Sequence, residues 1–380
     1  MIYFDNSATT FPSDRVRSAV NDMMADGLSG NPGSLHKLGV AADKAYAQTQ
    51  ANVARLLGAS DSEIIFTSCA TESANTAIRG FLSRNTRAGK RVISTRTEHK
   101  ATLECLALLE KSGYDVIYLP VGRDGKPVLS ELEKALTEDK TALLCFTLVN
   151  NETGSVLPVE QIVALRNKLS PDTKFYLDAV QALGKVPVDL HKLNVDMCSF
   201  SGHKIHSVKG TGVLYLKNGV RIDPLILGGG QQKGMRSGTQ SLLLAKAFEA
   251  ALEEALETMD ASHADIARIN GFLRKELVAR NAVILSPEDA LPNVLNVSFE
   301  GFESETMLHC LEMYDIYVST VSACSSKAKK VSYVLLESGV DRKTAANAVR
   351  LSFSRYNTME EAEEFIRKVD EIYDTFAVRK

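Results

Sequence analysis

The sequence has no basic leader followed by an apolar segment, and no apolar run approaches the about 20 residues that a membrane helix needs. Its six cysteines include no CxxC pair and no spacing typical of a zinc site. The formal net charge is −3 and no basic block stands out, so nucleic acid and anionic lipid are not expected partners. These absences predict a cytoplasmic protein with reduced thiols, no bound metal, no direct nucleic-acid contact and no membrane attachment.

Short apolar runs separated by segments with helical periodicity fill residues 60 to 220. Most of the runs are apolar throughout, as in strands that are covered on both faces. This order of elements is typical of a doubly wound α/β sheet. The predicted strands are Glu63–Thr67, Arg91–Thr95, Ala142–Val149, Lys174–Asp178, Met197–Ser201 and Gly212–Leu216.

Polar, chemically capable residues follow most of these strands, in the segments SCATES, RTEHK, NNETG, AVQ and GHK. An open parallel sheet binds its ligand at the carboxyl ends of its strands, so a ligand site is expected along this edge. A helical stretch from about Ser241 to Arg280 is expected to lead from the sheet into a smaller C-terminal sheet covered by helices.

Lys204 comes just after the strand MCSFS, in the motif SFSGHK. Taken alone, such a lysine is more simply explained by an ammonium group that reaches solvent. However, a lysine with a lowered pKa is the usual nucleophile toward an aldehyde cofactor. Asp178 ends the preceding predicted strand and can hold the pyridinium nitrogen of pyridoxal phosphate, although alone it could equally be a helix cap.

A cofactor phosphate would need hydrogen-bond donors at the start of a helix. Ala70 and Thr71 open an apolar-periodic segment directly after the strand EIIFT, where a capping box at Thr71 is the simpler alternative. Ser201 and His203 beside the lysine offer further donors. His99 in TEHK can stack on a planar cofactor or relay protons, although an isolated histidine is more often structural.

The motifs SFSGHK, FTSCATES, TEHK, VNNETG, LDAVQ, GMRSGT and SACSS make the chain similar to the cysteine desulfurases of the class V aminotransferase family. The resemblance extends from FDNSATT to VRLSFSRYNT, nearly the whole chain. It implies the transferase fold type I of pyridoxal phosphate enzymes, with a mostly parallel seven-stranded sheet in a large domain of residues 13–255. Residues 1–12 and 256–380 would form a smaller α/β domain. A homodimer with its active site at the subunit interface is also implied.

By this resemblance, Lys204 would form an imine with pyridoxal 5'-phosphate, and Asp178 would contact its pyridinium nitrogen. Arg350, with Asn31 of GNPGS, would bind the substrate carboxylate, a task suited to a planar guanidinium. The other implied cofactor contacts are His99 on the ring, Gln181 and Asn151 at the ring hydroxyl, Ala70, Thr71, Ser201 and His203 at the phosphate, and Thr239 from the other subunit.

Cys324 lies in VSTVSACSSKAKK, among small polar residues and near three lysines that favour a thiolate. A lone cysteine is more often a buried structural thiol, as expected of Cys145 in ALLCFTLV. The resemblance implies that Cys324 attacks the sulfur of L-cysteine. The products would be alanine and an enzyme persulfide, from which the sulfur passes to a protein acceptor in iron–sulfur cluster assembly or tRNA thiolation.

Three residues depart from the family pattern: Val321 and Cys69 stand where glycine is frequent, and His206 where tyrosine is frequent. The sequence also ends soon after EEAEEFIRKVDEIYD, without the segment that longer relatives use to dock iron–sulfur scaffold proteins. This favours another acceptor, such as a tRNA-thiolation protein. Two alternatives remain open. One is a selenocysteine lyase or another class V enzyme with the same cofactor residues, and the other is a degenerate relative that acts as a binding or regulatory subunit.

Overall fold

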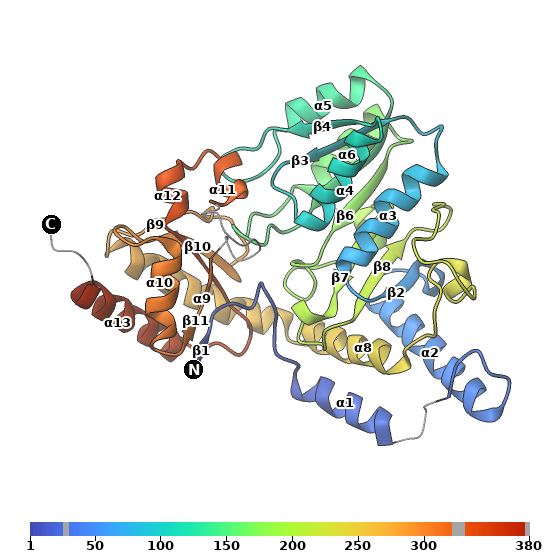
Figure 1. Ribbon diagram of the computed structural model, residues 1–380, viewed down its shortest axis with the longest axis horizontal. Helices are drawn as coiled ribbons and strands as arrows, with labels where there is room; N and C mark the ends of the chain where they lie inside the picture. The colour runs from blue at the N-terminus through green and yellow to red at the C-terminus, as the bar shows by residue number, and fades with distance from the viewer. Residues whose placement is uncertain (26–29, 321–330, 377–380) are drawn as a thin grey trace.

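The computed structural model describes residues 1–25, 30–320 and 331–376 of the chain. Its centre is a seven-stranded sheet with the strand order β2-β8-β7-β6-β5-β3-β4 (Figure 1). β8 runs antiparallel to both of its neighbours, and the other adjacent pairs are parallel. This is the mostly parallel α/β sheet expected for fold type I. The strands are β2 (Ile64–Thr67), β3 (Arg91–Thr95), β4 (Asp115–Leu119), β5 (Thr141–Thr147), β6 (Lys174–Asp178), β7 (Met197–Ser201) and β8 (Gly212–Leu216).

The bounds of β3, β6, β7 and β8 are those predicted from the sequence. β5 begins one residue before the predicted strand and ends at Thr147, because Leu148 and Val149 already enter the loop that carries NNETG. Glu63 belongs to a short 3-10 turn rather than to β2. The strand β4 was not predicted, since it lies at the sheet edge and Leu119 is its one fully buried residue.

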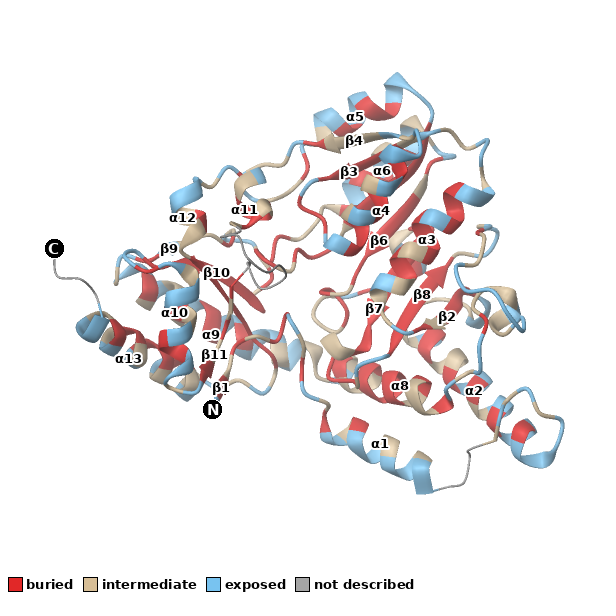
Figure 2. Ribbon diagram, in the orientation of Figure 1, coloured by how far each residue is buried: buried red, intermediate tan, exposed pale blue. Residues whose placement is uncertain are grey.

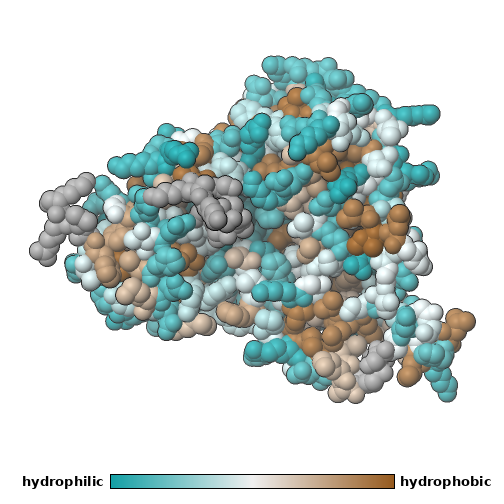
Figure 3. Space-filling view, in the orientation of Figure 1, coloured by the Kyte–Doolittle hydropathy of each residue, from teal (hydrophilic) through white to brown (hydrophobic). Residues whose placement is uncertain are grey.

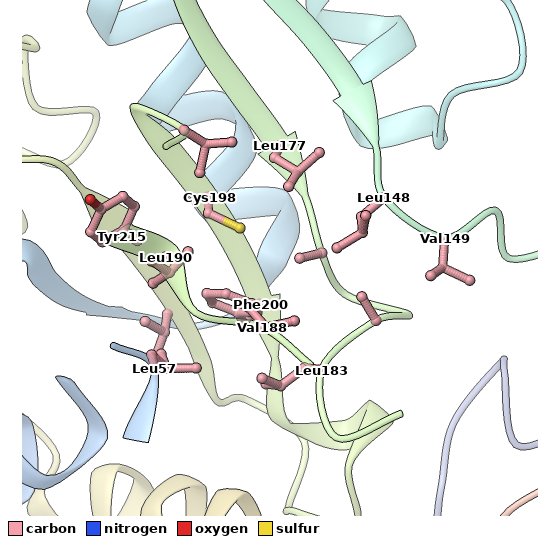
Figure 4. Packing of buried hydrophobic residues seen from close by; sticks show 14 of the residues in the cluster. Leu57, Leu148, Val149, Leu177, Leu183, Val188, Leu190, Cys198, Phe200 and Tyr215 are labelled. Atoms are coloured by element: carbon pink, nitrogen blue, oxygen red, sulfur yellow. The ribbon is translucent and has the colours of Figure 1, made fainter. Parts of the chain in front are cut away.

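Helices cover both faces of this sheet, so the large unit has three layers. Alternate side chains of each strand point to opposite faces: Cys198 and Phe200 of β7 enter one hydrophobic cluster, and Met197 enters the other. The first cluster is drawn in Figure 4, and Figure 2 shows the strands as the most continuously buried part of the molecule. The first cluster lies against α1 (Asp14–Ala25), α2 (Lys37–Leu56), α5 (Leu129–Glu138), α6 (Val159–Leu169), α7 (Leu190–Leu193) and α8 (Leu242–Glu257), and the second against α3 (Ala70–Arg84) and α4 (Lys100–Lys111).

A smaller unit contains an antiparallel sheet with the order β12-β13-β10-β9 and a parallel pair, β1 with β11. Ile2 and Phe4 at the start of the chain share one hydrophobic cluster with this C-terminal part. The predicted domain boundaries stay a prediction, which this clustering supports. The elements are β1 (Ile2–Tyr3), α9 (Met259–Val278), β9 (Val283–Ile284), β10 (Val294–Ser298), α10 (Ser304–Glu312), β11 (Ile316–Tyr317), β12 (Ser319–Thr320), α11 (Tyr333–Glu337), α12 (Arg342–Ala346), β13 (Ala348–Ser352) and α13 (Met359–Phe376).

The helical stretch predicted from about Ser241 to Arg280 is two helices, which is a correction to the sequence-based expectation. They meet at Thr258, whose backbone N–H and hydroxyl both donate to the carbonyl oxygen of Glu254, at 3.1 and 2.8 Å. This residue ends α8 and begins α9. The second helix ends at Val278, just before Asn281 takes a left-handed conformation with φ of 60°.

On the face drawn in Figure 3, hydrophobic residues gather in separate patches among hydrophilic ones. Cys145 is fully buried, as its apolar surroundings predicted. Within residues 1–25, 30–320 and 331–376, no helix has both the length and the apolar character needed to cross a membrane. The same residues contain no group of three or more acidic, histidine or cysteine side chains arranged to hold a metal ion.

Candidate active site

A cavity of about 200 Å³ opens at the carboxyl ends of β5, β6 and β7, beside the first turns of α3 and α4. This is the edge at which the sequence predicted a ligand site, and nine of the predicted site residues line it together. Its lining is Ser7, Cys69, Ala70, Thr71, His99, Thr147, Val149, Asn151, Asp178, Val180, Gln181, Ser201, His203 and Lys204.

Lys204 is carried into the cavity by a 3-10 turn, Gly202–Lys204, that follows β7 directly. A Cβ atom on Gly202 would lie 2.1 Å from Thr211 Oγ1, so only glycine lets the chain turn this tightly. Lys204 Nζ donates to the carbonyl oxygens of Ser7 at 2.5 Å and Ala8 at 2.7 Å. Burial, with a smaller effect of Arg350, lowers the pKa of Lys204 to about 8. A substantial fraction of this amine is therefore neutral, and hence nucleophilic, near physiological pH.

Asp178 ends β6 and stands beside Thr147 of β5 in the strand register. Only 4% of its surface is exposed, and its Oδ1 accepts a hydrogen bond from the backbone N–H of Val180 at 3.0 Å. Burial raises the pKa of Asp178, while His99 and Lys204 oppose that rise. A desolvated carboxylate of this kind is strongly stabilised by a cationic group placed against it.

His99 caps the N-terminus of α4, and its ring lines the cavity, where protein surrounds much of it although the cavity leaves one side open. Its Nδ1 accepts a hydrogen bond from the backbone N–H of Ala101 at 3.1 Å. Since that N–H can only donate, Nδ1 carries no proton, and the neutral ring carries its proton on Nε2. Burial and the nearby Lys204 lower the pKa of His99, although Asp178 acts against them, so the neutral form dominates at neutral pH.

The start of α3 is free to bind an anion. The helix begins at Ala70, so its N-cap residue is Cys69, and Cys69 makes no side-chain capping bond. Thr71 is already inside the helix, and the capping box considered there is therefore not formed. Ser201 Oγ is buried and has no hydrogen-bond partner. Burial lowers the pKa of His203 to about 4, which leaves a neutral ring. Uncapped helix N–H groups and an unpaired buried hydroxyl fit a phosphate group.

Asn151 is held at the cavity by the geometry of the NNETG loop. Asn150 Oδ1 accepts from the backbone N–H groups of Glu152 and Thr153, at 2.9 and 3.1 Å, which fixes a tight turn. Gly154 closes this turn with φ of +75°. The adjacent Asn151 therefore reaches the cavity, where Gln181 also lies.

Arg350 lies beside the cavity, on β13, rather than in its lining. Its Nη1 donates to the backbone oxygen of Asn151 at 3.0 Å, and its Nη2 forms an ion pair with Asp5 at 2.9 Å. The Nε atom is buried and has no hydrogen-bond partner among the described residues. Two of the five N–H groups of the guanidinium are therefore engaged, and three remain next to the residues that line the site.

Other predicted residues do not join this cavity in the same chain. Thr239 lines a neighbouring cavity of about 110 Å³, together with Ser68 and Arg236. Asn31 is exposed, and its side chain accepts from the backbone N–H of its near neighbour Gly33. Cys324 and Val321 lie outside the described residues.

Sequence reasoning missed Ser7, Thr147 and Val180 as lining residues. Ser7 stands in FDNSATT, a segment that carried the family resemblance but was given no role in the site. Thr147 is the last residue of a strand that ends at the binding edge, and its hydroxyl is buried without a partner. Its position at a strand end was the available signal.

The aminotransferase class-V family model matches residues 2–365 of the chain. The protein named cysteine desulfurase 2 of Trichormus variabilis is 40% identical, over 98% of this chain and 93% of its own length. A solved structure described as a NifS-like protein superposes with a TM-score of 0.93 at 40% identity, covering 98% of this chain and 99% of its own. A structure described as SspA in complex with cysteine gives a TM-score of 0.82 at 30% identity, with 94% and 100% of the two chains covered.

Proposed function

This chain belongs to the class V aminotransferase family, and from that premise we infer that it is a pyridoxal phosphate-dependent cysteine desulfurase. It cleaves the C–S bond of L-cysteine and forms alanine. The observation that carries this function is a single cavity in which the buried amine of Lys204 shares the lining with the carboxylate of Asp178 and the uncapped start of α3.

The donor set fits the cofactor group by group. The phosphate would lie at the start of α3 with Ser201 and His203, the pyridinium nitrogen would face Asp178, and Lys204 would hold the aldehyde carbon covalently. The ring would lie on His99, with Gln181 and Asn151 at its hydroxyl, and Thr239 would come from a second subunit. Bound there, pyridoxal phosphate supplies a sink for the electron pair left on the substrate Cα when that carbon loses its proton.

Lys204 and His99 are suited to move the protons of the reaction. The Nζ atom of Lys204, with its pKa lowered to about 8, can take up a proton near neutral pH when it is not bound to the cofactor. The Nε2 atom of His99 carries a proton because Nδ1 is engaged by Ala101, so it can act as a donor in the cavity. The two groups thus supply a base and an acid within one site.

Arg350 is proposed to bind the substrate carboxylate through its planar guanidinium, with Asn31 as a second contact. Its contact with the Asn151 backbone places it next to the cavity, and its unpaired Nε supplies a donor. The ion pair with Asp5 fixes the guanidinium and partly offsets its charge. The N–H groups that Asp5 and Asn151 leave free can bind a substrate carboxylate in addition to Asp5.

Cys324 is proposed to accept the sulfur, on the strength of its motif. Attack of its thiolate on the substrate sulfur forms an S–S bond and breaks the C–S bond, and the substrate Cβ then gains a proton. The described residues on both sides of its segment contact neighbours of residues that line the site: Ser319 pairs with Arg350, and Ser332 Oγ donates to Glu152 Oε2 at 2.5 Å. The persulfide sulfur would then pass to a protein acceptor of an iron–sulfur or tRNA-thiolation pathway.

A homodimer is proposed because large apolar side chains are exposed in two loops of the large unit. Leu227 is 80% exposed, in the loop that leads to Thr239, and Leu35 is 97% exposed before α2. Such side chains are expected to be buried by a partner surface. A second copy that covered this loop would bring its Thr239 toward the site of the first.

Incubating the yellow protein with ³⁵S-labelled L-cysteine tests this function. We expect alanine as a product, sulfide when a thiol reductant is present, and label on Cys324 in the absence of reductant. The Cys324→Ser variant should yield no labelled protein, whereas Cys310→Ala, at a buried position in the small unit, should be labelled like the wild type. Unchanged sulfide production by Cys324→Ser would exclude the persulfide route, and transamination without desulfuration would exclude the desulfurase.

The apo-protein should take up pyridoxal phosphate faster as the pH rises, with a plateau above about pH 8. The neutral amine is the reacting form, and burial lowers the pKa of Lys204 to about 8. Below this pKa, each unit of pH lowers the neutral fraction about tenfold. Stopped-flow measurement of the yellow absorbance from about pH 6 to about pH 10 checks this, with Nα-acetyl-lysine amide as the control. A protein rate that follows this model amine up to about pH 10 would contradict it.

A further inference from the structure

Lys185 is a partly buried lysine for which the mechanism above has no use. It follows Gln181 by four residues in the motif LDAVQALGK, in a helix-like turn closed by the bond from the Lys185 backbone N–H to the Ala182 carbonyl at 3.0 Å. Gly184 takes φ of +69° there, and a Cβ on it would meet the Ala255 side chain at 2.6 Å. The turn brings the Lys185 side chain back to Gln181, and Nζ donates to Oε1 of that amide at 2.8 Å.

The nitrogen and the oxygen of the Gln181 amide each have a hydrogen-bond partner, an acceptor for Nε2 and a donor for Oε1. Nε2 donates to the carbonyl oxygen of Ser7 at 2.9 Å, and a carbonyl can only accept. Oε1 can only accept, and it takes its hydrogen bond from Lys185 Nζ, which carries hydrogens in both its charged and its neutral form. The amide therefore has one orientation, in which Nε2 keeps a second hydrogen for a ligand in the cavity that Gln181 lines.

Lys185 forms no ion pair with a carboxylate among the described residues, so its contact with Gln181 is not a by-product of a salt bridge. With Lys204, His206 and Arg355 it lines a small cavity of about 40 Å³ behind the site, and the described residues of this lining include no acidic one. Burial, together with the charges of Lys204 and Arg350, lowers the pKa of Lys185 to about 7. Keeping a cation here costs desolvation free energy. The hydrogen bond to Gln181 offsets part of that cost.

We propose that Lys185 is a positioning residue that locks the Gln181 amide with its N–H toward the phenolic oxygen of the bound cofactor. This deepens the proposed function, since it rests on Gln181 being a cofactor ligand. Without Lys185, the Gln181 oxygen loses its donor and only the Ser7 carbonyl still favours the present orientation, so the amide is held less firmly and turns more often. In the turned orientation its oxygen would face the phenolic oxygen and disfavour the ionised, yellow form of the lysine-bound chromophore.

The test compares the cofactor complexes of the wild type, Lys185→Met and Lys217→Met. Lys217 is the matched control, because its Nζ also donates to a side-chain amide oxygen, that of Asn194 at 2.9 Å, at the opposite end of the sheet. For Lys185→Met we expect a loss of yellow absorbance in favour of the colourless form, and a dissociation constant for pyridoxal phosphate about five- to tenfold higher. Lys217→Met should match the wild type in both. Because it removes a partly buried cation that forms no ion pair among the described residues, Lys185→Met should fold, and Lys185→Leu serves as a second apolar replacement.

A double-mutant cycle with Gln181→Leu separates positioning from a general structural effect. If Lys185 acts through Gln181, Lys185→Met should change neither the absorbance ratio nor the dissociation constant further once Gln181 is leucine. Fully additive effects would overturn the proposal, as would wild-type spectra for Lys185→Met. Lys204→Ala is measured alongside: if it alone keeps the yellow form, the proposed function fails, whereas a bleached Lys204→Ala beside an unchanged Lys185→Met refutes only the role of Lys185.

Discussion

Replacing Lys204 with alanine is expected to lower the rate of alanine formation from cysteine by about 10⁴-fold or more, the upper end of what loss of a proton-transferring group costs. The amine that would hold the cofactor aldehyde and the base that would take the substrate proton are the same atom, Nζ. Its removal should also abolish the yellow absorbance of the protein, since Lys204 is the one lysine among the described residues that lines the cavity. Both readouts, steady-state rate and visible spectrum, come from one preparation.

The fold should survive this substitution. Lys204 Nζ is bound to backbone carbonyls of Ser7 and Ala8 rather than to a buried acid, so no carboxylate loses its only ion-pair partner. Lys217→Ala is the matched control, because this partly buried lysine is bonded to Asn194 away from the cavity. A Lys204→Ala protein that stays yellow and active, with Lys217→Ala unchanged, would show that another amine carries the chemistry.

Replacing Asp178 with asparagine should lower kcat for desulfuration by roughly 10²- to 10³-fold, the usual effect of removing one preorganised electrostatic group. Asparagine keeps the shape and the oxygen that accepts from the Val180 N–H, so the loss reflects charge rather than packing. Without this carboxylate the ring nitrogen of the cofactor would not be held protonated, and the substrate Cα proton would be harder to remove. A primary isotope effect with Cα-deuterated cysteine should grow accordingly.

Asp341→Asn is the control for this substitution. The Asp341 carboxylate also accepts backbone N–H bonds, from Lys343 and Thr344, but at the start of α12 in the small unit. Asparagine caps helices about as well as aspartate, so activity should be unchanged. Equal kcat values for Asp178→Asn and the wild type would remove Asp178 from the electron-sink role.

The large sheet and most of the cavity were predictable because their signals are local. Buried apolar strands with a chemically capable residue just past the last position are readable in one window of sequence, as in KFYLD and MCSFSGHK. Strand register then brings these residues together, because parallel strands place their carboxyl ends side by side. Thr147 lies beside Asp178, and Asp178 lies beside Ser199.

What the sequence did not reveal depends on distant or featureless parts of the chain. The carbonyl oxygen of Ser7 accepts hydrogen bonds from Gln181 and Lys204, which are 174 and 197 residues away in the chain. A contact made by a backbone oxygen has no signal in the sequence. The break at Thr258 interrupts a stretch of uniform helix propensity, where a single threonine is a weak stop signal. Lys185 was passed over because a lysine after a turn ordinarily reaches solvent.

The first strand of the chain sets the order in which the enzyme can be completed during synthesis. β1 pairs with β11, and Asn6 donates to the carbonyl of Ser352, 346 residues later in the chain. At the usual elongation rates of about 5 to 20 residues per second, roughly 20 to 70 seconds pass between the synthesis of Ser7 and that of β13, the strand that anchors it. The large unit can be assembled on the ribosome well before then, but its lysine site lacks the carbonyls of Ser7 and Ala8. We therefore expect the cofactor to load only near the end of translation.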